Sequence, residues 1–106
     1  MADQPTAVQV LDLGDLTVLG VVGDLDHDAA DRVDLETQKA LARDASIIVL
    51  DCSLLRSLGL EEAAVLSSVN DRVRGCDRRF VLRQPSARTC RLLARSGAHD
   101  LEVEPD

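Results

Sequence analysis

Aromatic side chains are almost missing from this chain of 106 residues, which has no Trp, no Tyr and a single Phe, Phe80. Proteins that bind single-stranded nucleic acid stack bases on aromatic rings, so this chain lacks such a platform. Basic residues are also few, since 12 Lys and Arg stand against 19 Asp and Glu and give a net charge of −7. Nucleic acids and anionic membranes repel that charge. We therefore expect neither as a partner and favour a protein with a basic face.

Long apolar runs are lacking as well. No stretch approaches the roughly 20 apolar residues that cross a bilayer. The acidic start, Met1 to Gln4, does not resemble a signal peptide. We therefore expect a cytoplasmic protein with no membrane insertion. Neither G-x-x-x-x-G-K-[ST] nor G-x-G-x-x-G occurs, so no phosphate-binding loop and no cofactor are predicted.

Metal and nucleophile motifs are equally scarce. Cys52, Cys76 and Cys90 are odd in number and widely spaced, which argues against a disulfide framework and a zinc site. We expect buried thiols; a redox pair of Cys52 and Cys76 would need Cα atoms within about 7 Å. His27 and His99 have no second ligand at a suitable spacing, and no G-x-S-x-G elbow is present. No metal site and no enzyme are predicted.

What the chain does contain is an aliphatic core of one domain. Apolar residues make up 45% and charged residues 29%, which is the balance of an ordinary globular protein. A length of 106 residues suits one core, because a second would have too little apolar surface. We expect residues 1–106 to form a single domain with flexible ends at residues 1–6 and 104–106.

Hydrophobic periodicity in the first half predicts a hairpin, a helix and a buried strand. Strands over residues 7–13 and 16–22 flank Gly14-Asp15, which suits a tight turn. A helical repeat begins near Asp26 or Asp28 and continues to about Arg43. The branched run over residues 47–50 is too short for a helix and indicates a central parallel strand.

The second half predicts two further helices and two strands. One helix runs from about Leu60 to Gly75, which we place as the left-handed cap. A strand over residues 80–82 follows. The last helix opens at Pro85-Ser86 and stops at Gly97, before a weak strand over residues 101–103; the face that it buries is predicted to hold Ala87, Cys90, Leu93 and Ala94. This order predicts an α/β fold: a mixed central sheet with an N-terminal hairpin and about three helices packed on it.

Three local motifs, in this element order, resemble the STAS family, the domain of bacterial anti-sigma factor antagonists and of the cytoplasmic tails of some anion transporters. The segment over residues 22–26, V-G-D-L-D, is similar to the family's turn after the second strand. Residues 50–53, L-D-C-S, are similar to the end of its central strand. The last helix, from P-S at 85–86 through R-L-L at 91–93 to S-G at 96–97, is similar to the family's final helix.

A fourth motif departs from the family. Phosphoregulated members continue into the second helix with D-S-[ST]-G-L, whose first serine accepts the phosphate. Aligned without gaps, this chain has G-L-E-E-A at residues 59–63, so Leu60 replaces the acceptor. The resemblance therefore implies a STAS-like binding module with no phosphoacceptor, whose partner is an anti-sigma factor of the serine kinase type. The residues expected to bind this partner are Asp24, Asp26, Ser57, Leu58, Gly59, Leu60, Glu61 and Glu62.

Several interpretations remain open at this stage. Glu61 and Glu62 stabilise the helix start by about 0.3–1 kcal/mol each through the dipole, or they imitate phosphate charge. Ser53 and Ser57 are the remaining hydroxyls of the loop; they either accept a phosphate in place of the missing serine or have a structural role. The four arginines between residues 72 and 79 form a solvated helix end or an anion contact. A homodimer, a scaffold subunit of a signalling complex, the soluble subunit of a lipid-transport ABC complex, and a small hydrolase or redox enzyme are the alternatives.

Overall fold

The structure is a computed structural model that describes residues 6–98 and 100–104. Its elements follow one another as β1 (Thr6–Asp12), β2 (Leu16–Leu25), α1 (His27–Ala42), β3 (Ile47–Asp51), β4 (Leu55–Leu58), α2 (Leu60–Gly75), β5 (Arg79–Arg83), α3 (Ala87–Arg95) and β6 (Glu102–Glu104). The sheet order is β1-β2-β3-β5-β6, and β4 pairs with the end of β2. Among these strands only β1 is antiparallel to its neighbour. The predicted mixed α/β sheet, with its hairpin and three helices, is confirmed.

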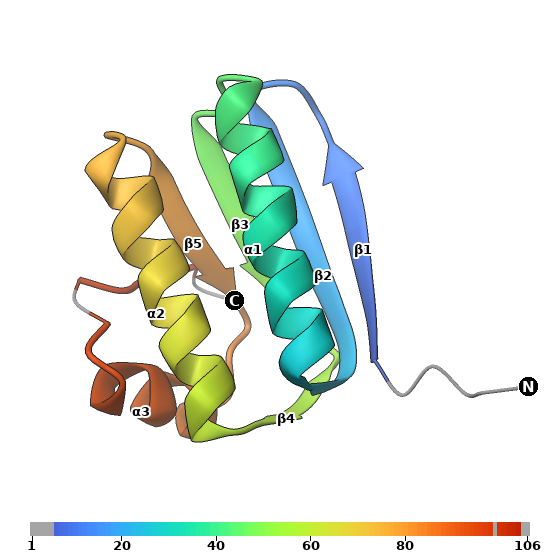
Figure 1. The fold of residues 1–106 in the computed structure, drawn as a ribbon, viewed down its shortest axis with the longest axis vertical. Coiled ribbons are helices and arrows are strands. Elements are labelled where there is room, and N and C mark those ends of the chain that lie inside the picture. Colours follow the sequence, from blue (N-terminus) through green and yellow to red (C-terminus); the bar gives the residue numbers. More distant parts are fainter. Residues whose placement is uncertain (1–5, 99, 105–106) are drawn as a thin grey trace, which may run out of the picture.

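The core lies between the sheet and the two long helices. Figure 1 shows α1 and α2 running over the same face of the sheet. Alternate side chains of each central strand point to that face, as the period of two requires; Leu19, Leu50 and Leu82 are fully buried there. The neighbouring Val49 is nearly as buried, which confirms β3 as a central strand. No helix in residues 6–98 and 100–104 is long and apolar enough to cross a membrane.

A residue with a left-handed backbone follows each of the three helices. After α2, Asp77 has φ 60°, while the amide N–H groups of Asp77 and Arg78 donate to the carbonyls of Arg74 and Val73 at 3.0 and 3.1 Å. This is the Schellman arrangement. Our prediction of Gly75 as the left-handed cap is therefore wrong, because the helix continues through Gly75 and turns two residues later. The predicted stop at Gly97, with φ 94°, is confirmed.

Strand β4 was not predicted. It spans four residues and pairs in parallel with β2 from Gly23 to Leu25, beside a register shift between Gly23 and Asp24. Only its last residue, Leu58, is buried, so the sequence shows no alternation to reveal it. Strand β2 consequently runs to Leu25, beyond the predicted end at Val22.

Thr6 pairs with Gly23 and Glu104 pairs with Arg83; residues 1–5 and 105–106, which make up most of the predicted flexible ends, lie outside the described part. A further prediction needs correction. The face of α3 that packs inward holds Thr89 and Leu93, with Cys90 half-buried, whereas Ala87 and Ala94 are exposed. The hydroxyl of Ser86 caps this helix by accepting from the Thr89 amide at 3.0 Å.

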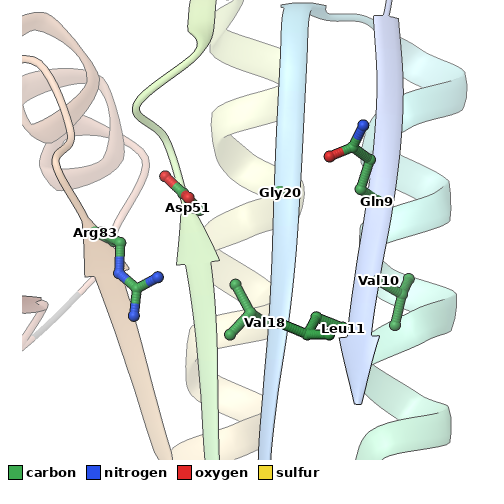
Figure 2. A pocket seen from close by; sticks show the side chains of 7 residues that line it. All are labelled: Gln9, Val10, Leu11, Val18, Gly20, Asp51 and Arg83. Atoms are coloured by element: carbon green, nitrogen blue, oxygen red, sulfur yellow. The ribbon is translucent and has the colours of Figure 1, made fainter. Parts of the chain in front are cut away.

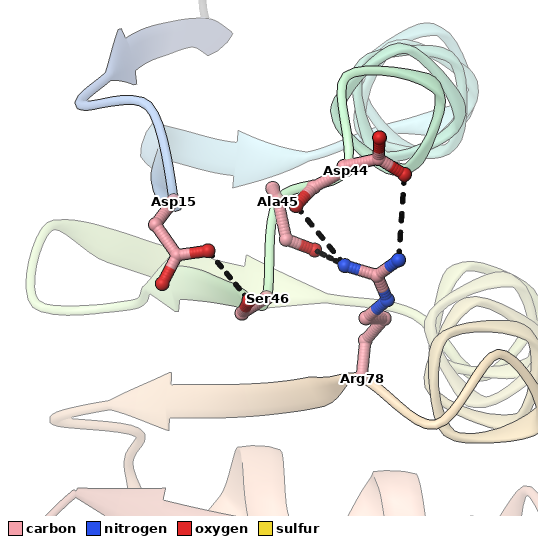
Figure 3. A network of polar contacts seen from close by, with 5 residues as sticks. All are labelled: Asp15, Asp44, Ala45, Ser46 and Arg78. Carbon is pink, nitrogen blue, oxygen red and sulfur yellow. Dashed lines mark hydrogen bonds and ion pairs between the residues drawn. The ribbon is translucent and has the colours of Figure 1, made fainter.

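Polar contacts fix the end of the sheet at which β3 begins (Figure 3). The hydroxyl of Ser46 donates to the Asp15 carboxylate at 2.5 Å. The Arg78 guanidinium donates to the carbonyls of Asp44 and Ala45 at 3.0 and 3.1 Å. The other three arginines between residues 72 and 79 each pair with a carboxylate of the chain, namely that of Asp34, Asp100 or Glu102. Each of these four arginines therefore has a carboxylate partner within the described residues.

Candidate functional site

The candidate site lies at the end of the molecule where α1 and α2 begin. The two helices run in the same direction and start at the same end, with β4 crossing between them (Figure 1). The carboxyl end of β2 lies at this place too, because β2 leads directly into α1. The positive ends of both helix dipoles therefore point outward here. Their acidic neighbours come from β2, from the cap of α1 and from the first turn of α2.

Asp24 holds the loop together. Its carboxylate accepts a hydrogen bond from the Ser57 hydroxyl at 2.9 Å and lies 3.5 Å from the Arg56 guanidinium nitrogen Nε. These contacts join the end of β2 to β4. The side chain of Arg56 is 77% exposed, so the ion pair contributes little to stability. The Ser57 hydroxyl, whose role the sequence did not decide, therefore donates a hydrogen bond to this carboxylate.

Asp26 has a structural task as well. Its carboxylate accepts from the Ala29 amide at 2.8 Å, and its extended backbone marks it as the N-cap of α1. Such a cap satisfies one of the free amides of the first turn. The helix accordingly begins at the next residue, in agreement with the predicted start. The side chain remains exposed and adds negative charge to this end of the molecule.

The start of α2 presents an apolar residue between acids. Leu60 is the first helical residue and is 55% exposed. Gly59 is the N-cap and offers no side-chain cap. The Glu62 carboxylate folds back over Gly59, so that a Cβ added there would lie 2.6 Å from its Oε1 atom. Glu61 is exposed and Glu62 is half-buried. An exposed leucine is thus framed by carboxylates that suit the helix start.

Leu58 is the exception among the predicted contact residues. Its side chain is only 6% exposed and belongs to the core, so it holds β4 on the body and offers no side-chain surface. Leu54, in the turn before β4, is 63% exposed, and its carbonyl accepts from the Gly23 amide at 3.0 Å; it lines a small hollow with Gln9, Gly20 and Asp51.

Cys52 lies in the loop between β3 and β4, where it is buried. Burial, reinforced by the charges of Asp51 and Cys90, raises the pKa of its thiol to about 12. The thiol therefore stays protonated and unreactive at neutral pH. Cys76 is exposed, so the expectation of buried thiols is wrong for this residue, and the structure contains both as free thiols. These observations give no support to a redox role for the pair.

A hollow of about 330 Å³ lies on the other face of the sheet (Figure 2). Its charged lining residues are Asp51 and Arg83. Asp51 already accepts from the Ser53 amide at 3.0 Å, and Arg83 pairs with Glu104 at 3.1 Å. No histidine or cysteine of the described residues lines this hollow. A catalytic cluster of the kind that the hydrolase hypothesis required is not formed there.

Metal ligands are not gathered anywhere in the described residues, since no group of three His, Cys, Asp or Glu side chains could hold an ion. His27 is exposed and lies 3.5 Å from Asp31 in the same helix. His99 lies outside the described residues. The site at the start of α2 is therefore a surface with an exposed apolar residue and negative charge, which suits binding to another macromolecule.

A family of known proteins matches nearly the whole chain. The family model described as "Mlab, STAS domain" matches residues 7–103. The chain belongs to the STAS domain family. A comparison with curated proteins found no match.

Solved structures show the same fold in anti-sigma factor antagonists. This STAS domain is similar to SpoIIAA in its unphosphorylated form, with 16% identity, a TM-score of 0.77 and coverage of 94% of this chain and 89% of the other. An anti-sigma factor antagonist from Mycobacterium paratuberculosis is 20% identical, with a TM-score of 0.75 and coverage of 95% of this chain and 86% of the other. A serine-to-glutamate variant of RsbS from Moorella thermoacetica is 18% identical, with a TM-score of 0.77 and coverage of 93% of this chain and 86% of the other. These likenesses confirm the predicted STAS-like fold.

Proposed function

We propose that this STAS domain is a non-enzymatic binding module of the anti-sigma factor antagonist type. It engages an anti-sigma factor of the serine kinase type through β4, the following turn and the start of α2. The observation that carries the proposal is the 55% exposed side chain of Leu60 at the first position of α2, where phosphoregulated relatives are expected to carry a serine. Family membership and the antagonist fold support the same function.

The surface around Leu60 has the properties of a small interface centre. Apolar side chains dominate the centre of protein interfaces, while charged groups lie at the rim. Complete burial of a leucine contributes about 1.5–3 kcal/mol. The acidic rim of Asp24, Asp26 and Glu61 would speed association with a basic partner. This rim agrees with the net charge of −7.

No serine switch operates at this position in the proposed function. Leu60 has no hydroxyl, and the Ser57 hydroxyl already donates to Asp24. Glu61 and Glu62 are acidic residues of the first turn whose presence does not depend on a kinase, so binding would be constitutive. Whether these acids also imitate a phosphorylated loop is decided by the effect of Glu61→Ser with Glu62→Gly on affinity. Unchanged affinity would leave them the role of stabilising the helix.

The test uses purified anti-sigma serine kinases from the source genome and calorimetric titration. We expect wild-type protein to bind one of them equally well before and after incubation with ATP, and to gain no phosphate by mass spectrometry. Leu60→Ser should become phosphorylated and then bind at least about tenfold more weakly, which corresponds to about 1.4 kcal/mol. Leu35→Ser is the matched control, because Leu35 is also exposed but lies on α1; it should change neither property.

Three results would oppose the proposal. The first is phosphate on the wild-type loop after incubation with a partner kinase. The second is the absence of binding to every such kinase. The third is tight binding to a membrane transport ATPase or to a large signalling assembly in their place, which would favour the scaffold alternatives.

A further inference from the structure

Arginines outside α3 are engaged within the chain. Each one lies within 4.0 Å of a carboxylate oxygen; they are Arg32, Arg43, Arg56, Arg72, Arg74, Arg78, Arg79 and Arg83. Helix α3 differs. Its three arginines, Arg88, Arg91 and Arg95, are exposed and have no such carboxylate among residues 6–98 and 100–104. In a chain with a net charge of −7, the unpaired arginines of the described part therefore gather on one helix.

The three guanidinium groups share one face. Spacings of three and four residues bring side chains to the same side of a helix, and Leu92 lies between them. Together with Leu92 the arginines line a groove of about 260 Å³. From Arg88 to Arg95 the face extends over about 10 Å, which is roughly two helical turns. This length matches a short peptide segment.

The arrangement is unfavourable for the isolated helix. Arg88 is in the first turn, where the dipole favours acids, and α3 has no acid there. Arg88 and Arg91, and again Arg91 and Arg95, are like charges at neighbouring positions, which repel. A local rule broken without a compensating contact is characteristic of functional surfaces. No carboxylate of the described residues offsets the positive charge of these arginines.

We propose that the face of α3 formed by Arg88, Arg91, Leu92 and Arg95 binds an acidic segment of a partner protein. Guanidinium groups hold carboxylates in paired, planar hydrogen bonds, so each arginine selects an Asp or Glu side chain. Leu92 accepts an apolar side chain between them. Arginine is also enriched among the residues that dominate protein interfaces. This surface is distinct from the acidic, leucine-centred start of α2, and it stands whether or not the proposed function does.

The short length of the face favours a protein over other polyanions. Lipid-binding basic clusters hold about 4–8 Lys or Arg residues, and duplex DNA binding commonly uses about 6–10 phosphate contacts. Three arginines on a protein of net charge −7 meet neither need, because the rest of the surface repels an extended polyanion. A peptide of two turns contacts only the basic face.

The experiment uses a fluorescein-labelled helical peptide with glutamates three and four residues apart and a central leucine. Anisotropy is measured at low and at high NaCl, about 50 and 300 mM, because salt screens ion pairs between exposed groups. The proteins are wild type, R88Q/R91Q/R95Q and the control R32Q/R43Q/R72Q, and the two variants have the same net charge because each loses three arginines. We expect the α3 variant to bind at least about tenfold more weakly, the control to stay within about twofold of wild type, and salt to weaken wild-type binding. Far-UV circular dichroism verifies that both variants fold.

Several outcomes would overturn the proposal. One is wild-type protein that does not bind the peptide. Another is equal weakening by both triple variants, because net charge alone would then explain the binding. The last is tighter binding of wild type to phosphatidylserine vesicles or to duplex DNA than to the peptide, with that binding lost in the α3 variant. This outcome would assign the face to a lipid surface or to nucleic acid.

Discussion

The buried thiol of Cys52 predicts a specific loss of stability in base. Its pKa in the folded protein is about 12, whereas a thiol in an unfolded chain has a pKa of about 8.5. The folded state keeps a proton that the unfolded chain releases above about pH 9. Stability from this group is therefore fully present below the unfolded pKa and is lost as the pH rises towards the folded pKa. The slope is about 1.4 kcal/mol per pH unit.

The expected loss between about pH 8 and pH 11 is about 3 kcal/mol, obtained from the two pKa values by linkage. Few other groups interfere, because the chain has no Tyr and its single lysine is Lys39. Cys52→Ala should remove the steep fall in stability, although it lowers stability at neutral pH by about 1 kcal/mol through lost packing. Cys76→Ala is the control, since Cys76 is exposed and should leave the fall unchanged.

Urea denaturation followed by circular dichroism measures this effect, with a phosphine reductant to prevent oxidation. The absence of Trp and Tyr makes intrinsic fluorescence a poor probe. The free energy of unfolding is compared at about pH 8, 9.5 and 11, which bracket the range over which the unfolded thiol ionises. Parallel curves for wild type and Cys52→Ala would refute the reasoning. So would equal rates of reaction of Cys52 and Cys76 with a thiol reagent in the native protein near neutral pH.

Three smaller predictions concern charge and capping. Arg88→Glu should stabilise the protein by about 0.5–1 kcal/mol, since it relieves repulsion by Arg91 and suits the helix dipole; a lower urea midpoint would contradict this. Asp26→Ala should cost about 1 kcal/mol through the lost cap of α1, measured in the same way. The hydrogen bond from Arg79 lowers the pKa of Glu102. This pair therefore stabilises the folded protein above the unfolded pKa of about 4.3, and that stabilisation is lost as the pH falls through the folded pKa. Glu102→Gln should therefore lose less stability than wild type between about pH 5 and pH 2.

Much of the fold was predictable because local sequence patterns determine most of its helices and strands. The branched run over β3 and the helical repeat of α1 each match one period and one length, so their types were predicted correctly. Ser86 and Gly97 marked α3 by capping chemistry that acts over three or four residues. These signals act between near neighbours in the sequence, which is why they could be predicted.

The remaining features depend on contacts between distant segments. Strand β4 exists because β2 offers it a parallel partner, and its own four residues carry no alternation. Leu58 looked like a loop residue for the same reason, although it is buried. The unpaired arginines of α3 could not be recognised, because only the structure shows that every other described arginine has a carboxylate beside it.

The left-handed turn after α2 offers a practical advantage for work on the opposite end of that helix. Asp77 has φ 60°, a conformation that costs an L-amino acid about 1 kcal/mol and a glycine almost nothing. Asp77→Gly should therefore raise the melting temperature by a few degrees. A more stable parent protein of this kind tolerates destabilising substitutions at Leu60 or along α3. A variant that then fails to bind would be a folded protein that has lost its contact.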